Sequence, residues 1–146
     1  MFAAMSMTLA TSVFAADWQT DLAKAQAQAK TENKQILIDF TGSDWCGWCI
    51  KLDKEVFSQK EFEEYAKKNL NLLEIDFPRK KQLSAELKAQ NEALAKKYNI
   101  EGFPTIIVLN PDGTKAGELG YTAGGPAAFI DVLKKEAPAL QVATQK

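Results

Sequence analysis

Both cysteines of this 146-residue chain lie in one short stretch, Trp45-Cys46-Gly47-Trp48-Cys49. Two thiols separated by two residues can close into a disulfide and open again, which is the chemistry of thiol–disulfide exchange. A bridge over so small a loop restricts the unfolded chain little, because stabilisation by loop closure grows with loop length. The spacing therefore favours a redox role for the pair over a structural cross-link.

Cys46 is placed where a predicted strand meets a predicted helix. Residues 35–40 form an apolar run typical of a buried central strand, and residues 50–57 carry Leu52 and Val56 on one helical face. Free N–H groups and the helix dipole favour an anion at a helix N-terminus, and the anion that Cys46 can supply is its thiolate. We therefore expect Cys46 to be the nucleophile.

The second cysteine, Cys49, is expected one turn into the same helix, more buried, as the partner that closes the disulfide. A thiol of pKa ~8.5 is only about 3% ionised at pH 7, and lowering its pKa to ~7 requires about 2 kcal/mol. One helix end supplies only ~0.3–1 kcal/mol of this. A hydrogen bond from the Cys49 thiol is therefore expected to help stabilise the Cys46 thiolate.

Composition excludes several other classes of site. The chain contains no histidine, which removes Cys–His pairs, Ser-His-Asp triads and His-ligated metals. A net charge of −1 does not indicate nucleic acid as a partner. Two thiolates supply half of a tetrahedral zinc site, so a metal or an iron–sulfur cluster would require two chains. We expect no metal and no cofactor besides the redox-active Cys46–Cys49 disulfide.

The first fifteen residues carry no charge and end in Val13-Phe14-Ala15, a small-x-small pattern. We interpret residues 1–15 as a secretory signal peptide cleaved after Ala15, although the Lys or Arg of a usual n-region is missing. The alternative is an Ala-rich N-terminus of a cytosolic protein. Residues 16–137 are expected to form one domain, and residues 138–146 a flexible tail.

Periodicity and turn residues predict the other elements. Asp17 is expected to cap a first helix that includes Trp18, and Ser58 with Glu61 forms the pattern of a capping box. The Arg79-Lys80-Lys81 run is expected to be a solvated loop. The further predicted elements are a strand over residues 71–77, a helix over 82–98, strands over 105–109 and 115–119, and a helix from Pro126.

The CxxC stretch, the segment Gly102-Phe103-Pro104-Thr105 and the order β-α-β-α-β-β-α together resemble the thioredoxin superfamily over residues 17–135. Residues 39–49 are similar in particular to exported thioredoxin-like proteins of bacteria. The resemblance implies an α/β thioredoxin fold, with a central mixed sheet of about four strands flanked by helices and an N-terminal helix. It also implies a periplasmic or otherwise exported protein.

The resemblance assigns roles to residues outside the cysteine pair. Pro104 matches a proline that is cis in this family and faces the disulfide, where the Phe103 backbone can pair with an extended substrate segment. Trp45 is favoured as a substrate contact over half-buried packing. For Trp48 both interpretations remain open.

Asp39 resembles the buried acid that assists proton transfer at the second cysteine in thioredoxins. Flanking apolar residues should raise its pKa by desolvation, which would suit a proton acceptor. A hydrogen-bonded strand-end carboxylate is the alternative, and both remain open. This chain has one more residue between Asp39 and Cys46 than typical thioredoxins have. The lysine that pairs with the buried acid in thioredoxins has no match at the aligned position near Leu72, whereas Glu74 is close in sequence.

These features predict a monomeric thiol–disulfide oxidoreductase that reduces protein disulfides in the bacterial cell envelope, with a membrane or envelope redox partner. The lack of a histidine between the cysteines favours the reducing direction, because one thiolate-stabilising neighbour is missing. The alternatives are a disulfide donor or isomerase with the same site, and a binding or chaperone module whose cysteines form an incidental bridge.

Overall fold

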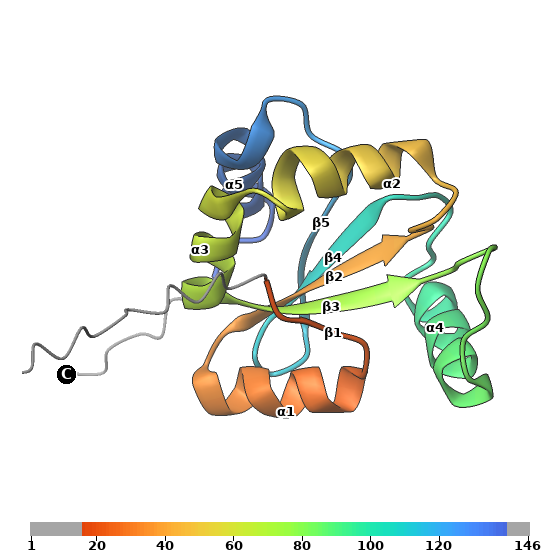
Figure 1. Ribbon diagram of the computed structural model, residues 1–146. Coiled ribbons are helices and arrows are strands. Elements are labelled where there is room, and N and C mark those ends of the chain that lie inside the picture. Colours follow the sequence, from red (N-terminus) through yellow and green to blue (C-terminus); the bar gives the residue numbers. More distant parts are fainter. Residues whose placement is uncertain (1–15, 140–146) are drawn as a thin grey trace, which may run out of the picture.

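The computed structural model describes residues 16–139, so the predicted signal segment and residues 140–146 of the predicted tail lie outside the described part of the chain. Figure 1 shows one mixed sheet with helices on both faces. The elements are β1 (Trp18–Gln19), α1 (Leu22–Glu32), β2 (Gln35–Thr41), α2 (Gly47–Leu52), the π-helical η1 (Asp53–Phe57), α3 (Lys60–Asn69), β3 (Leu70–Asp76), α4 (Ala85–Lys97), β4 (Thr105–Leu109), β5 (Lys115–Leu119) and α5 (Gly125–Glu136).

The sheet has the strand order β1-β3-β2-β4-β5. Strands β1, β3 and β2 are parallel, β4 runs antiparallel to β2, and β5 antiparallel to β4. All seven residues of β2 are buried, which confirms the predicted central strand. The sheet contains five strands instead of about four, because the two residues of β1 pair with Leu72 and Leu73 at its edge.

Two apolar clusters hold the layers together. Helices α2, α3 and α5 cover one face of the sheet, and α1 covers the other (Figure 1). Successive strand residues point to opposite faces, so Leu37 packs with Leu52 and Val56, whereas Ile36 and Ile38 join the other cluster. By the same alternation Asp39 shares the face of Leu37, which places it on the side of the sheet that carries the cysteine helix.

The first helix begins later than predicted. Trp18 is extended in β1, and its ring lies 5.1 Å from that of Phe57 in the cluster on the α3 side. Helix α1 packs on the opposite face, so Trp18 cannot belong to it. The predicted Asp17 cap is therefore wrong, and Asp21 caps the helix by accepting a hydrogen bond from the Lys24 N–H at 3.2 Å.

The predicted capping box at Ser58 is also wrong. The Ser58 hydroxyl donates to the Asp53 carboxylate at 3.2 Å, and α3 begins after Gln59 without a side-chain cap. Other boundaries differ slightly: β3 begins and ends one residue earlier than predicted, and α4 begins at Ala85, where the Ser84 hydroxyl accepts from the Leu87 N–H at 3.2 Å.

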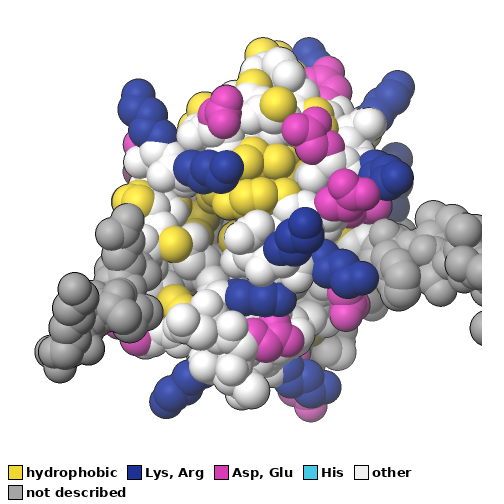
Figure 2. Space-filling view, turned by 90° about the vertical axis from the view of Figure 1, so that its left-hand side faces the viewer, with side chains coloured by type: hydrophobic (Ala, Val, Ile, Leu, Met, Phe, Trp, Pro, Cys, Tyr) yellow, Lys and Arg dark blue, Asp and Glu magenta, His cyan; other side chains and the backbone are white. Residues whose placement is uncertain are grey.

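The α3 side of the molecule carries a hollow with an apolar floor ringed by charged side chains (Figure 2). Leu70 and Leu72 line it, together with Ala66 of α3. These residues lie toward the start of β3, whereas Cys46 follows the end of the parallel strand β2, so the hollow and the cysteine pair lie at opposite ends of the sheet.

None of the helices within residues 16–139 has the length and apolar character that a membrane span requires.

Candidate active site

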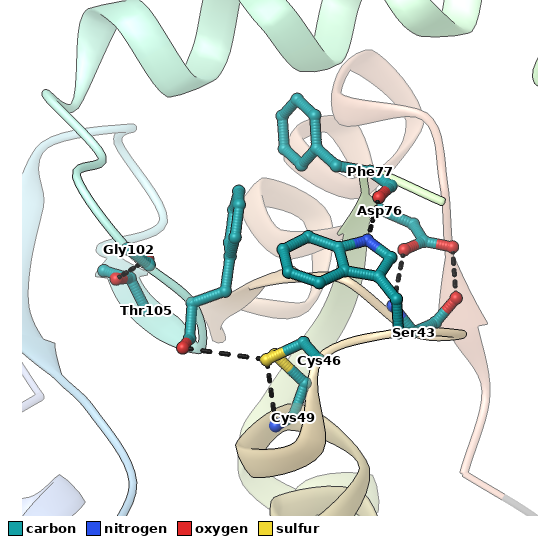
Figure 3. The surroundings of a disulfide bond; sticks show 9 residues. Ser43, Cys46, Cys49, Asp76, Phe77, Gly102 and Thr105 are labelled. Atoms are coloured by element: carbon teal, nitrogen blue, oxygen red, sulfur yellow. Dashed lines mark hydrogen bonds between the residues drawn. A yellow bond between two sulfur atoms is a disulfide. The ribbon is translucent and has the colours of Figure 1, made fainter. Parts of the chain in front are cut away.

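The cysteine pair lies where β2 ends and α2 begins. The turn after Thr41 is closed by the N–H groups of Trp45 and Cys46, which donate to the Gly42 carbonyl at 3.2 and 2.9 Å. Cys46 is the N-cap of α2, and its sulfur is joined to Cys49 in a disulfide with a Cα–Cα distance of 5.2 Å (Figure 3). The predicted strand-to-helix junction is therefore present.

The sulfur of Cys46 lies between two backbone groups. The Cys49 N–H donates to it at 3.3 Å, and the Phe103 carbonyl oxygen lies 3.7 Å away (Figure 3). Once the disulfide is reduced, the same N–H is placed to stabilise a Cys46 thiolate, as expected at a helix N-terminus. In the disulfide form the donor is the backbone of Cys49, not its thiol.

Both sulfur-bearing residues are almost enclosed. Cys46 is 7% exposed and Cys49 is 5% exposed, so the expected difference in burial between the two is small in the oxidised state. The asymmetry lies in their surroundings, because the Cys46 sulfur faces the Phe103 carbonyl of the neighbouring turn.

The Phe103–Pro104 peptide bond is cis, as the resemblance implied. The turn that contains it is closed by the Thr105 hydroxyl, which donates to the Gly102 carbonyl at 2.7 Å (Figure 3). Strand β4 then begins at Thr105 and pairs with Phe40 of β2. The sheet thus holds the proline turn and the cysteine turn against each other.

Trp45 is half-buried and anchored on the side of β3. Its indole N–H donates to the Phe77 carbonyl at 2.7 Å, and its ring meets that of Phe103 edge to face at a centroid distance of 6.0 Å. Next to it, the Ser43 N–H and hydroxyl both donate to the Asp76 carboxylate (Figure 3). These contacts fix the cysteine turn to the end of β3.

Trp48 belongs to a different group of side chains. It is 57% exposed, and its ring lies 5.0 Å from that of Tyr121, in the loop after β5. The Lys51 ammonium lies over both rings, while the Tyr121 hydroxyl donates to the Glu55 carboxylate. The two tryptophans are therefore not one cluster, and Trp48 offers an exposed aromatic surface.

Asp39 lies on the sheet beneath the cysteine helix and pairs in register with Glu74. It is buried, and its Oδ1 has no hydrogen-bond partner among the described residues. At this oxygen, Asp39 is therefore not the hydrogen-bonded strand-end carboxylate of the alternative interpretation. Desolvation, followed by the negative charges of Glu74, Asp53 and Asp76, raises the pKa of Asp39 well above its usual value. No hydrogen bond within residues 16–139 joins it to either cysteine.

The loop that follows β3 contributes side chains that sequence reasoning missed. The Arg79 guanidinium lies 3.7 Å from the centre of the Trp45 ring. The Asp44 carboxylate accepts hydrogen bonds from the N–H groups of Arg79 at 3.0 Å and Lys80 at 2.8 Å, and the Arg79 bond chiefly lowers the pKa of Asp44. Residues 79–81 form an exposed loop, as predicted, but the contact of Arg79 with Trp45 was not predicted.

Gly42 provides the space that the Trp45 ring occupies. A Cβ at Gly42 would lie 2.4 Å from Cε2 of the indole, which Phe77 and Arg79 hold in place. We expect Gly42→Ala to lower the free energy of unfolding by about 1–3 kcal/mol, measured by urea unfolding. Gly102→Ala is the matched control, because no atom lies within 4 Å of its Cβ. Equal losses in the two variants would contradict this explanation.

Comparison with known proteins agrees with this geometry. Residues 22–137 match the model of a thioredoxin-like domain. The disulfide bond reductase DsbH of Chlamydia pneumoniae is 34% identical over 117 residues, which cover 80% of this chain and 70% of that protein. The thiol:disulfide interchange protein DsbD of Klebsiella pneumoniae is 29% identical over 103 residues, 70% of this chain but only 16% of DsbD.

A solved structure of a DsbH oxidoreductase superposes with a TM-score of 0.80 at 30% identity, covering 92% of this chain and 93% of the other. The match therefore extends over nearly the whole of both chains. The chain belongs to the thioredoxin-like domain family.

Proposed function

We propose that this chain, a thiol–disulfide oxidoreductase, works as a reductase of protein disulfides in the bacterial cell envelope. The observation that carries the proposal is the position of the Cys46 sulfur, which caps α2 and faces the carbonyl of Phe103 beside the cis Pro104. This arrangement supplies a stabilised thiolate and, next to it, backbone to which an extended substrate segment can bind.

The reaction transfers two electrons in two exchange steps. The Cys46 thiolate attacks one sulfur of the substrate disulfide, the substrate S–S bond breaks, and the departing sulfur takes up a proton as a thiol. Cys49 then gives its proton to an acceptor, for which we propose Asp39, and attacks the Cys46 sulfur. The mixed disulfide breaks, the second substrate sulfur leaves as a thiolate and takes up a proton, and the Cys46–Cys49 disulfide remains.

Three observations support the reducing direction. The chain has no histidine to stabilise a thiolate beside Cys46. Asp39 lies on the face of the sheet that carries the cysteine helix, and its neighbours Glu74 and Asp53 are acidic; negative charge on that face disfavours a reduced, ionised pair. The Chlamydia relative is itself named a disulfide bond reductase.

The proposal extends to location and partners. Residues 1–15 would direct export to the periplasm, and a dithiol protein of the membrane or envelope would return the two electrons after each turnover. Trp45, Trp48, Phe103 and Pro104 would form the surface that meets the substrate. The protein would act as a monomer, with its disulfide as the redox centre and no other cofactor or metal, and without nucleic acid.

The test is the reduction potential of the cysteine pair, equilibrated against glutathione and followed by tryptophan fluorescence. We expect a value near ~−270 mV, in the range of thioredoxin. A value near ~−120 mV would instead indicate a protein that donates disulfides. A pair inert to thiol exchange would overturn the enzymatic proposal and leave a binding module.

A further inference from the structure

The guanidinium of Arg79 lies on the side chain of Trp45 in the cysteine turn, and the reaction above does not use it. It lies over the ring of Trp45, the residue before Cys46, at 3.7 Å, and Arg79 is exposed. Arginine carries five N–H donors in a rigid fork. Within residues 16–139 no carboxylate or carbonyl accepts a hydrogen bond from this fork, so its donors are available to a ligand.

The position of Arg79 is set by contacts on both sides. Its backbone N–H donates to Asp44, and the indole beneath it is anchored to the Phe77 carbonyl at 2.7 Å. An arginine that stacks on a ring keeps the edge of its guanidinium free, and a fixed side chain loses less entropy when it binds. Arg79 is therefore organised before any ligand arrives.

Nearby acidic groups do not neutralise this edge. The Asp44 carboxylate is occupied by two backbone N–H groups, and Asp76 accepts from Ser43 and pairs with Lys81 at 3.6 Å. Lys80 adds a further positive charge to the same loop. Arg79, Lys80 and Lys81 together therefore outweigh the two carboxylates of Asp44 and Asp76, and the charge left over is positive.

The opposite side, around Trp48, differs in charge. The cation there is Lys51, whose ammonium lies over the aromatic rings and 3.9 Å from the Glu55 carboxylate. Its charge is thus balanced within the cluster, whereas that of Arg79 is not. A substrate lying across the disulfide would meet a cation on one side and a balanced aromatic surface on the other.

We infer that Arg79, held on Trp45, is a recognition site for an acidic side chain of the protein substrate, close in sequence to the cysteine that Cys46 attacks. A carboxylate can accept two parallel hydrogen bonds from the guanidinium edge. The inference rests on the proposed function, since it describes how the same site selects a substrate. It makes Arg79 a specificity-determining residue that takes no part in the electron transfer.

The test uses disulfide-linked peptides that differ only in Glu or Gln at one of the two positions on either side of the attacked cysteine. The readout is the ratio of kcat/KM for the Glu peptide to that for the Gln peptide. For the wild-type protein we expect a ratio of about three to ten at the best position, falling as salt is added. In Arg79→Ala the ratio should fall to about one, and Arg79→Lys should give an intermediate value.

Lys88→Ala, a change of the same charge on the exposed side of α4, is the matched control and should keep the wild-type ratio. A wild-type ratio of one, or an Arg79→Ala variant that slows both peptides equally, would overturn the inference and leave Arg79 as packing for Trp45. Glutathione disulfide is measured as a further substrate. If Arg79→Ala slows its reduction but that of neither peptide, the inference is also overturned, in favour of a small anionic substrate. If the wild-type protein reduces no disulfide, the proposed function fails and the inference with it.

Discussion

Replacing Cys46 with Ser is expected to lower the rate of thiol–disulfide exchange by about 10³-fold or more, because a serine hydroxyl is not ionised near neutral pH and cannot form the mixed disulfide. The change removes only the sulfur that caps α2 and faces the Phe103 carbonyl. The measurement is the reduction of a disulfide-bonded protein in the presence of excess dithiol.

Cys49→Ser separates the roles of the two sulfurs. Cys46 can still attack in this variant, but nothing resolves the product, so the mixed disulfide should accumulate and appear as a covalent complex by non-reducing electrophoresis and mass spectrometry. The double variant is the control and should trap nothing. If Cys46→Ser accumulates the complex and Cys49→Ser does not, the assigned roles are reversed.

Much of the fold follows from patterns that lie within single segments. Residues 35–40 and 105–109 are apolar enough to be buried strands, and β2 and β4 occupy them as neighbours at the centre of the sheet. The strand, the two cysteines and the helix after them are consecutive in sequence, so their junction could be predicted. The cis Phe103–Pro104 bond came from the resemblance and is present.

The parts that sequence reasoning missed depend on contacts between distant segments. Asp44 accepts hydrogen bonds from residues 35 and 36 positions later, and no local pattern distinguishes it from an ordinary turn aspartate. Arg79 is exposed, and only the fold brings the ring of Trp45 beneath its guanidinium. Trp18 fits a helical period, but its burial against Phe57 requires the face opposite to α1.

The direction of Glu74 could not be read from the sequence either, because a shift of one residue in strand pairing reverses the face to which a side chain points. The structure pairs Glu74 with Asp39, so both carboxyl groups lie on the face that carries the cysteine helix. The family's partner lysine has no match in this chain, and the register partner of the buried acid is itself an acid. Burial and like charge therefore both raise the pKa of Asp39, and the free energy of unfolding depends on pH as a result.

Asp39→Asn is expected to stabilise the protein at neutral and alkaline pH. The pKa of Asp39 is raised in the folded state above its ordinary 3.8, chiefly by desolvation and then by Glu74, Asp53 and Asp76. The folded state therefore holds a proton that the unfolded state has lost, and the free energy of unfolding falls as pH rises above 3.8 toward the folded pKa, by at most about 1.4 kcal/mol per pH unit.

The amide that this substitution introduces cannot titrate, so the variant should match the wild-type protein below pH ~4 and exceed it increasingly above that value. Urea unfolding at a series of pH values measures the difference. Glu74→Gln keeps Asp39 but removes its register partner's charge, so it should weaken the same pH dependence without abolishing it. A constant difference between Asp39→Asn and wild type at all pH values would show that Asp39 does not titrate in this range.

The same variant tests the proposed proton acceptor, and here its effect on activity should be opposite to its effect on stability. Without the carboxylate, resolution of the mixed disulfide by Cys49 should slow by about tenfold to a hundredfold at pH ~7. The rate should recover above pH ~8.5, where a thiol ionises without help. Rapid-mixing measurements of the resolving step across this range distinguish the outcomes. Slowing by the same factor at every pH would assign Asp39 a structural role, whereas a more stable variant that is slow at pH ~7 and recovers its rate above pH ~8.5 would identify the buried carboxylate as the acceptor of the Cys49 proton.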